Sequence, residues 1–225
     1  MFDRVIKMIG KENFNKINKA TIAVVGIGGV GGYAVEGLVR SGVNSIILVD
    51  YDVIEESNLN RQIIADKKHH GYFKVDEMES RILNINPDCK VVKIYDKLSV
   101  DNIDILFKYS FDYLIDACDT ILVKQELIRL CLEKNISIIS CMGTGNKMNP
   151  SELEVTDIWK TSYDPIAKKI RKYLKEQHIY NKVPVVYSKE QNEKFEGSIP
   201  SMIFVPATAG LLCANYVIKS IINRI

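Results

Sequence analysis

A glycine-rich turn that directly follows a short apolar run constrains this chain more than any other feature. Residues 21–25 (TIAVV) have the composition of a buried strand, and glycines follow at the spacing G-x-G-x-x-G. Gly26 permits a tight turn, Gly28 lets the backbone approach a phosphate, and Gly31 lets the next helix pack closely on the sheet. The stretch therefore predicts a strand, a turn and a helix, and the turn, which includes Gly29, faces an anionic ligand.

An acidic residue closes the next apolar run and extends this motif. Residues 45–49 (SIILV) predict a second strand, and Asp50 follows its last residue. A carboxylate at that point can accept hydrogen bonds from the hydroxyls of a ribose. The glycines and Asp50 together therefore predict a nucleotide site.

The side chains that follow favour ATP over NAD as the nucleotide. Residues 57–62 (SNLNRQ) include Asn58 and Arg61, and Lys74 lies just before a predicted helix. Arg61 and Lys74 suit the charge of a triphosphate and of a pyrophosphate leaving group, whereas a dehydrogenase needs no basic side chain there. Asp119 follows another predicted strand and is placed to hold Mg²⁺ against the phosphates. These residues predict an attack on ATP that forms an acyl-adenylate.

The order of the predicted elements favours an α/β fold. After a short N-terminal helix, strands are expected at 21–25, 45–49, 90–94, 113–116 and 136–141, and helices at 32–41, 75–83 and 124–133. This alternation predicts a Rossmann-like, doubly wound, mostly parallel sheet with its site at the carboxyl ends of the strands. The pattern then changes, and strands expected at 153–159 and 183–187 around a basic helix predict a smaller C-terminal extension.

Five motifs occur along the chain in an order that is typical of one superfamily. They are G-x-G-G-V-G, Asp50-x-Asp52, Ser-Asn-x-x-Arg-Gln, Lys74 and Asp116-x-x-Asp119. In these motifs the chain resembles the adenylation domain of ubiquitin-activating-enzyme-like (ThiF/MoeB/HesA) adenylyltransferases.

Motifs in the second half narrow this resemblance. Residues 142–150 (MGTGNKMNP), 155–162 (VTDIWKTS), 164–168 (DPIAK) and 185–188 (VVYS) are similar to the tRNA threonylcarbamoyladenosine dehydratase branch. The resemblance covers nearly the whole chain and implies a single adenylation domain over 1–225. Its nucleotide-binding half is expected at about 1–141, and a half that contacts tRNA and a partner subunit at about 142–225.

The resemblance implies a role for each residue that matches a nucleotide-binding motif. Gly28 would lie under the adenosine and the phosphates, and Asp50 would bind the ribose. Asn58 and Arg61 would contact the phosphates, and Lys74 would neutralise charge as pyrophosphate leaves.

Two further roles also come from the resemblance. Asp119 would bind Mg²⁺, and Arg4 would reach across to the ATP of a partner subunit. A homodimer is therefore expected, because Arg4 would otherwise have no site to complete.

The cysteines separate this chain from many sulfur-carrier adenylyltransferases. They are Cys89, Cys118, Cys131, Cys141 and Cys213. No two have the spacing C-x-x-C, so no structural zinc site is expected, and none lies in a motif of a thioester nucleophile. Their scattered positions suit a reducing cytosol, and Cys141 is expected to be a small buried residue.

A basic helix is the second functional feature. Asp164 and Pro165 predict its start, and residues 160–182 contain seven Lys or Arg against two Asp or Glu. A solvated helix face is one interpretation of this excess, and the backbone of a tRNA is the partner that we favour. The candidate nucleic-acid contacts are Lys168, Lys169, Arg171 and Lys172.

Residues 199–218 contain no charged side chain, which raises the question of a membrane. The predicted helix 211–222 is shorter than the roughly 20 residues that a span needs, so packing on the sheet or at a dimer interface is expected. No signal peptide opens the chain, so a cytoplasmic location is expected, with loose membrane association left open.

The resemblance implies a specific reaction, whereas the residues alone argue only for adenylation. The expected reaction is an ATP-dependent dehydration, by cyclisation, of threonylcarbamoyladenosine in tRNA through an acyl-adenylate, with ATP and Mg²⁺. Some family members also work with a cysteine desulfurase or a sulfur-acceptor protein. Two alternatives stay open: an adenylyltransferase for the C-terminus of a ubiquitin-like sulfur carrier, and a non-catalytic or NAD-binding module.

Overall fold

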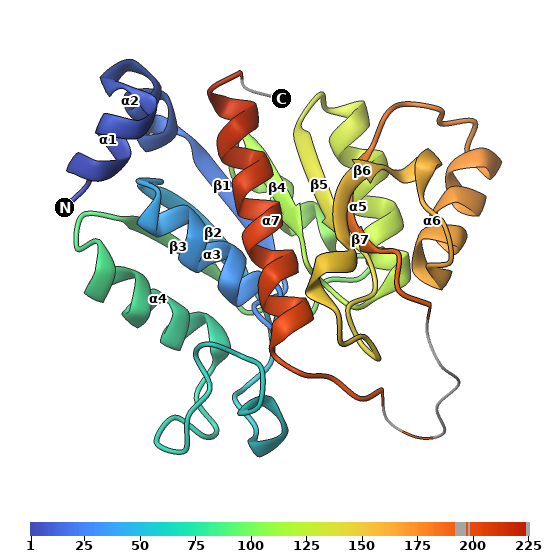
Figure 1. Cartoon of the computed structure of the whole chain (residues 1–225), viewed down its shortest axis with the longest axis horizontal. Helices are drawn as coiled ribbons and strands as arrows, with labels where there is room; N and C mark the ends of the chain where they lie inside the picture. The colour runs from blue at the N-terminus through green and yellow to red at the C-terminus, as the bar shows by residue number, and fades with distance from the viewer. Residues whose placement is uncertain (192–196, 198, 224–225) are drawn as a thin grey trace.

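A single seven-stranded sheet forms the centre of the molecule. The computed structural model describes residues 1–191, 197 and 199–223. The strands are β1 (Thr21–Val25), β2 (Ser45–Val49), β3 (Lys90–Ile94), β4 (Tyr113–Asp116), β5 (Ser137–Cys141), β6 (Leu153–Asp157) and β7 (Pro184–Ser188), in the spatial order β3-β2-β1-β4-β5-β7-β6. Only β6 runs antiparallel to its neighbour. The predicted α/β fold with a mostly parallel sheet is therefore confirmed (Figure 1).

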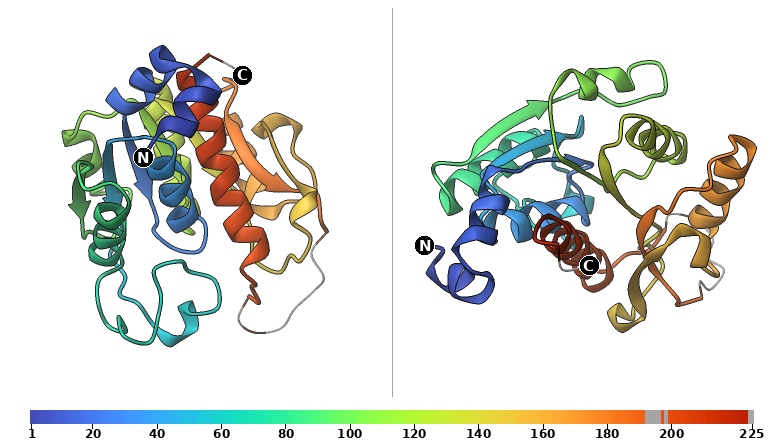
Figure 2. Two further views of the ribbon diagram at one scale, coloured as in Figure 1. Left: turned by 60° about the vertical axis from the view of Figure 1, so that its left-hand side comes forward. Right: turned by 90° about the horizontal axis from the view of Figure 1, so that it is seen from above.

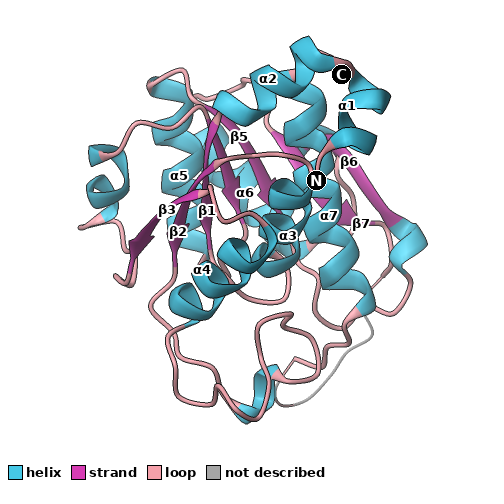
Figure 3. Ribbon diagram, turned by 90° about the vertical axis from the view of Figure 1, so that its left-hand side faces the viewer, coloured by secondary structure: helices cyan, strands magenta, loops and turns pink. Residues whose placement is uncertain are grey.

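Helices cover both faces of this sheet. They are α1 (Asp3–Ile9), α2 (Lys11–Lys19), α3 (Gly31–Arg40), α4 (Lys74–Ile85), α5 (Ile121–Glu133), α6 (Pro165–Glu176) and α7 (Phe204–Ile221). Because side chains alternate along a strand, Ile22 and Val24 belong to the core cluster that includes residues of α3, α4 and α7, whereas Ala23 and Val25 belong to the cluster that includes residues of α5 and α6. Figures 2 and 3 show these helical layers around the strands. Burial on both faces explains why the central strands are continuous apolar runs.

The strand order reverses next to the glycine-rich turn. β1 pairs with β2 on one side and with β4 on the other, so the connections from β1 and from β4 leave in opposite directions. In open α/β sheets such a switch point opens a crevice at the carboxyl ends of the strands. Loop 50–73 lies at that end, and α1 and α2 lie at the opposite end (Figure 1).

Several element boundaries differ from the prediction. The last helix begins at Phe204, seven residues before the predicted start. Pro206 does not prevent this early start, because it lies in the first turn, where backbone N–H groups make no hydrogen bond within the helix. β6 ends at Asp157, whose side chain accepts a hydrogen bond from the Trp159 amide and begins a 3₁₀ helix. The N-terminal region forms two helices, separated at Gly10 with φ of 85°.

The last helix is a packed layer of this fold. It lies against α3 and against the face of β5 and β6, and it buries Ala209, Cys213 and Val217. A Cβ added at Gly210 would lie 2.1 Å from the Val30 carbonyl oxygen, so the two backbones approach more closely than another residue permits. By length and composition alone α7 could cross a membrane, and it is the one helix of the described residues that passes this test.

Candidate active site

A cavity of about 290 Å³ lies at the carboxyl ends of β1, β2 and β4. The sequence-predicted residues that line it are Gly26, Gly28, Gly29, Asp50, Asn58, Arg61, Lys74 and Asp119. Thr144, Ser201 and Pro206 from the second half of the chain also line this cavity. The structure therefore brings together eight candidate residues that the chain separates by up to 93 positions, from 26 to 119.

The glycines of the turn are required by close backbone contacts. Gly26 has φ of +88°, and a Cβ there would lie 2.7 Å from the Ala117 carbonyl oxygen. A Cβ on Gly31 would lie 1.7 Å from the Gly26 carbonyl oxygen. The turn is therefore folded back on itself and against the end of β4, which leaves Gly28 and Gly29 facing the cavity.

Asp50 holds this turn against β2. Its carboxylate accepts hydrogen bonds from the Ile27 amide at 2.6 Å and from the Asp52 amide at 2.9 Å. Burial raises the pKa of Asp50, and the charge of Lys74 and the two amides offset only part of that rise. Asp50 therefore shapes the turn as well as lining the cavity, a role that the sequence motif did not indicate.

Lys74 is held in the cavity wall by an acidic partner. Its ammonium lies 2.7 Å from the Asp52 carboxylate, and its amide donates to the Asp52 carbonyl at 3.0 Å. The Lys74 side chain is 6% exposed, whereas that of Asp52 is 45% exposed. Asp52 belongs to a motif in the sequence, but its pairing with Lys74 depends on loop 50–73, which places the two residues side by side.

Asn58, Arg61 and Gln62 come from one turn of that loop. Asn58 accepts a hydrogen bond from the Glu55 amide, and Arg61 Nη1 donates to the Ser57 carbonyl and to Asn60 Oδ1, both at 2.8 Å. Among the described residues, Gln62 Oε1 is the one buried side-chain oxygen without a hydrogen-bond partner. Gln62 itself lines the cavity, with its side-chain nitrogen beside Gly28.

The two acids of the Asp116-x-x-Asp119 motif have different surroundings. Asp116 is fully buried and accepts hydrogen bonds from Lys124 Nζ at 3.1 Å and from the Ser140 hydroxyl. Asp119 is exposed and accepts a hydrogen bond from the neighbouring Thr120 hydroxyl. Asp119 is therefore the carboxylate of this motif that a ligand can reach.

Lys124 is a buried charged residue beside the site that sequence reasoning missed. Burial by itself lowers the pKa of Lys124, but the Asp116 carboxylate outweighs that effect, so the pKa is raised and the ammonium stays charged. Its Nζ also donates to the Cys141 carbonyl at 2.7 Å. The sequence feature that could have indicated this pair is a lysine on the buried face of a predicted helix, eight residues after Asp116.

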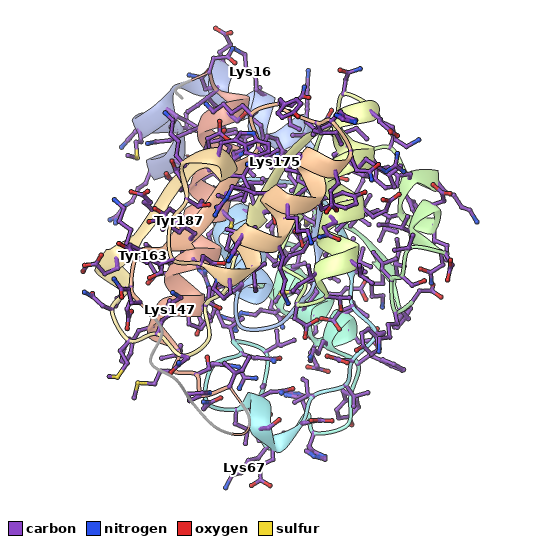
Figure 4. The ribbon with its side chains drawn as sticks, turned by 90° about the vertical axis from the view of Figure 1, so that its right-hand side faces the viewer. Lys16, Lys67, Lys147, Tyr163, Lys175 and Tyr187 are labelled. Carbon is purple, nitrogen blue, oxygen red and sulfur yellow. The ribbon has the colours of Figure 1, made fainter. Side chains whose placement is uncertain are left out.

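Arg4 does not line the cavity of its own chain. It is exposed on α1, which packs against α2 at the opposite end of the molecule. Figure 4 shows this separation, since Lys16 of α2 and Lys67 of loop 50–73 lie at opposite ends.

The four candidate nucleic-acid contacts on α6 differ in exposure. Lys168, Lys169 and Lys172 are exposed. Arg171 is half-buried, and its Nη1 donates to the Thr161 hydroxyl and to the Ile158 carbonyl. Asp164 caps the helix by accepting a hydrogen bond from the Ala167 amide at 2.8 Å, and Pro165 occupies the first turn.

Metal ligands are sparse in the described part of the chain. No group of three His, Cys, Asp or Glu side chains there could hold a metal ion, and the five cysteines are free thiols.

A second cavity, of about 480 Å³, adjoins the first. The residues common to both walls are Val30, Ala117, Cys118, Asp119 and Thr144. The second cavity extends from this shared edge toward the start of α6.

Comparison with known proteins identifies the family. The family model described as "ThiF family" matches residues 2–224. A tRNA threonylcarbamoyladenosine dehydratase of Bacillus subtilis is 38% identical over 242 residues, covering 100% of this chain and 95% of that protein. The Escherichia coli enzyme of the same name is 37% identical over 64% of this chain and 53% of its own length.

A solved structure agrees with this assignment. The E. coli dehydratase in complex with ATP has a TM-score of 0.94 at 33% identity, covering 99% of this chain and 93% of that one. The family match extends over almost the whole sequence, and the chain therefore belongs to the ThiF family.

Proposed function

We propose that this protein catalyses the ATP-dependent dehydration of threonylcarbamoyladenosine in tRNA through an acyl-adenylate. The observation that carries the proposal is one cavity that unites the glycine turn, Asp50, Arg61, Lys74 and Asp119. It occurs in a chain whose relative of nearly equal length bears the name of that dehydratase. The similarity to an ATP complex supports ATP as the nucleotide.

The first step joins the substrate to AMP. The carboxylate of the threonylcarbamoyl group attacks the α-phosphorus of ATP, and the bond to the β-phosphate oxygen breaks to release pyrophosphate. Arg61 and Lys74 line the cavity on one side, where two positive charges stabilise the charge that develops on the phosphates. The Lys74 ammonium, held by Asp52, is in place before the substrate binds.

The second step needs no nucleophile from the protein. The ureido group of the substrate attacks its own activated carbonyl, loses a proton and expels AMP, so the oxygen of the eliminated water leaves on AMP. An intramolecular closure is favoured by proximity alone. Burial raises the pKa of Cys118, the cysteine in the shared wall, well above its ordinary value, which is unfavourable for a thiolate.

The residues of this cavity could bind Mg²⁺ only if the phosphates of the nucleotide supplied further oxygen ligands. Asp119 is exposed in the cavity wall, whereas Asp116 is buried in an ion pair with Lys124. Mg²⁺ is commonly held by one or two carboxylates together with substrate phosphates, and Asp119 would be the protein ligand here. The ion would supply charge stabilisation during phosphoryl transfer.

A homodimer is part of this proposal. Arg4 is exposed on α1, which lies at the end of the molecule opposite loop 50–73 (Figure 1), so it can act only on the nucleotide of another copy. We expect Arg4→Ala to reduce turnover by about 10²-fold, as the loss of one charge-stabilising group does. Mixing Arg4→Ala with Arg61→Ala should restore activity in the dimers that retain one intact site, and no restoration would contradict the shared site.

Mass spectrometry of tRNA carrying threonylcarbamoyladenosine tests the reaction. After incubation with the protein, ATP and Mg²⁺, the nucleoside should lose the mass of one water, with AMP and pyrophosphate in equal amounts. AMP formation that requires a sulfur-carrier protein and leaves the nucleoside unchanged would contradict the dehydratase. It would favour the carrier adenylyltransferase instead, and only that result would make a cysteine desulfurase or sulfur-acceptor partner the next question.

A further inference from the structure

The second cavity has mostly apolar walls. Met142, Ile166, Ile199 and Pro200 line it, and Gly143 adds bare backbone. Its volume of about 480 Å³ lies within the roughly 300–1,000 Å³ that small-molecule sites occupy. The cavity is therefore large enough for a modified purine base, and Asn146 and Asp164 add polar groups to its mostly apolar wall.

The Lys124 ammonium in the wall of this cavity cannot donate a hydrogen bond to a ligand. Lys124 lines the cavity, but its Nζ already has three acceptors, namely both Asp116 carboxylate oxygens and the Cys141 carbonyl. An ammonium has three donors, so this one has none left for a bound molecule. Lys124 therefore has no donor to offer the polar end of a ligand, whereas the edge shared with the first cavity carries Thr144 and Asp119.

That shared edge carries the polar groups that face both cavities. Thr144 and Asp119 line each of them, and Val30 and Ala117 form the rest of the boundary. A group that crosses this edge moves from the second cavity to the phosphate side of the first. The geometry suits a substrate whose reacting carboxylate lies at one end and whose bulky part lies at the other.

The start of α6 connects the second cavity to the basic surface. Pro165 and Ile166 in its first turn line the cavity, and Lys168 and Lys169 lie one turn further on and are exposed. Figure 4 looks onto this helix, with Tyr163 just before its first residue and Lys175 near its last turn. A nucleic-acid backbone that follows α6 therefore passes beside the cavity, within reach of an extruded base.

We propose that the second cavity holds the purine and threonyl groups of the modified adenosine, with its carboxylate directed over Thr144 toward ATP. The assignment rests on the proposed function and specifies where that substrate binds. Ile166 and Gly143 are then specificity-determining positions, because both border the space that the base would occupy.

Two substitutions that narrow the cavity test this assignment. Ile166→Trp adds bulk at the start of α6. Gly143→Val is a second variant at a site with room, since an added Cβ would meet Ile166 Cδ1 at 3.4 Å and Asp164 Oδ2 at 3.5 Å. Leu83→Trp is the matched control, because Leu83 is 39% exposed on α4, which packs against α3 and β3, and it lies outside both cavities.

The KM for modified tRNA and the Kd for ATP are measured for each protein. Both narrowing variants should raise the KM by about tenfold or more, equivalent to about 1.4 kcal/mol, with the Kd for ATP and the circular dichroism spectrum unchanged. The control should match the wild type in both constants.

The outcomes separate this assignment from the proposed function. An active wild type with an unchanged KM in both narrowing variants would overturn the assignment and leave the function intact. A wild type that fails to dehydrate modified tRNA would overturn both.

Discussion

At the scale of the residue, Arg61 is the side chain on which the adenylation proposal depends most. It lines the nucleotide cavity, and its position is fixed by hydrogen bonds from Nη1 to the Ser57 carbonyl and to Asn60. These contacts are local to one turn, so removal of the guanidinium should leave the remaining fold intact. Its loss should therefore affect chemistry more than stability.

We expect Arg61→Ala to lower kcat for adenylate formation by about 10²- to 10³-fold, as the loss of one preorganised charge does. Pyrophosphate release with modified tRNA measures this effect, and thermal unfolding checks the fold. Lys67→Ala is the matched control, because Lys67 is exposed in the same loop and outside the cavity. Turnover near the wild-type value in Arg61→Ala would refute the role of Arg61.

At the scale of the element, α6 divides its residues between the core and the surface. Ala167, Ile170 and Leu174 are buried on the side of α6 that packs in the core with α5, and Lys168, Lys169 and Lys172 are exposed. The apolar residues recur at helical spacing, so the sequence indicated which face packs. Arg171 was predicted among the nucleic-acid contacts, and its hydrogen bonds to Thr161 and Ile158 give it a second, structural function.

We predict that reversing the charge of Lys168, Lys169 and Lys172 to Glu weakens tRNA binding and spares ATP binding. Phosphate contacts depend on salt, so the slope of log affinity against log salt should also become shallower. Fluorescence anisotropy with labelled tRNA at several salt concentrations gives both quantities. Unchanged tRNA affinity at moderate salt would exclude α6 as the tRNA surface.

At the scale of the whole molecule, a charge cluster links two helices that flank the nucleotide cavity. Glu36 of α3 accepts hydrogen bonds from Arg40 at 2.6 Å and from Arg81 of α4 at 2.7 and 3.0 Å. Burial by itself raises the pKa of Glu36, but the two arginines outweigh burial and hold the pKa below its ordinary value of 4.5.

This lowered pKa predicts how stability changes with pH. The unfolded chain binds a proton at Glu36 more readily than the folded chain, so the contribution of Glu36 is fully present above about pH 4.5 and is lost as the pH falls through the lowered folded-state value. Urea unfolding of wild type and Glu36→Gln should therefore give free energies that differ at neutral pH and converge in acid. A difference that stays constant across that range would contradict the prediction.

The sequence by itself determined the parts of this protein that depend on neighbouring residues. The sequence pattern identified β1 to β5 within one residue. The central strands β1, β2, β4 and β5 are mostly apolar because both of their faces are buried, whereas the edge strand β3 carries Lys90 and Lys93. The glycine turn and the motifs after it named eight residues that line one cavity. Gly26, Asp50 and Asp119 lie near strand ends, whereas Asn58, Arg61 and Lys74 come from loop 50–73 or directly follow it. The C-terminal boundaries were less accurate, as the early start of α7 at Phe204 shows.

Only the tertiary structure decided which side chains meet across elements. The pairing of Lys124 with Asp116, the hydrogen bonds from Asp50 to the turn and the orphaned Gln62 oxygen all depend on how loops and helices pack at the switch point. The second cavity likewise requires β5, α6 and residues 199–200 to come together from distant parts of the chain. Local patterns specify elements and motifs, whereas a site is a set of distances between elements, and packing of the whole chain fixes those distances.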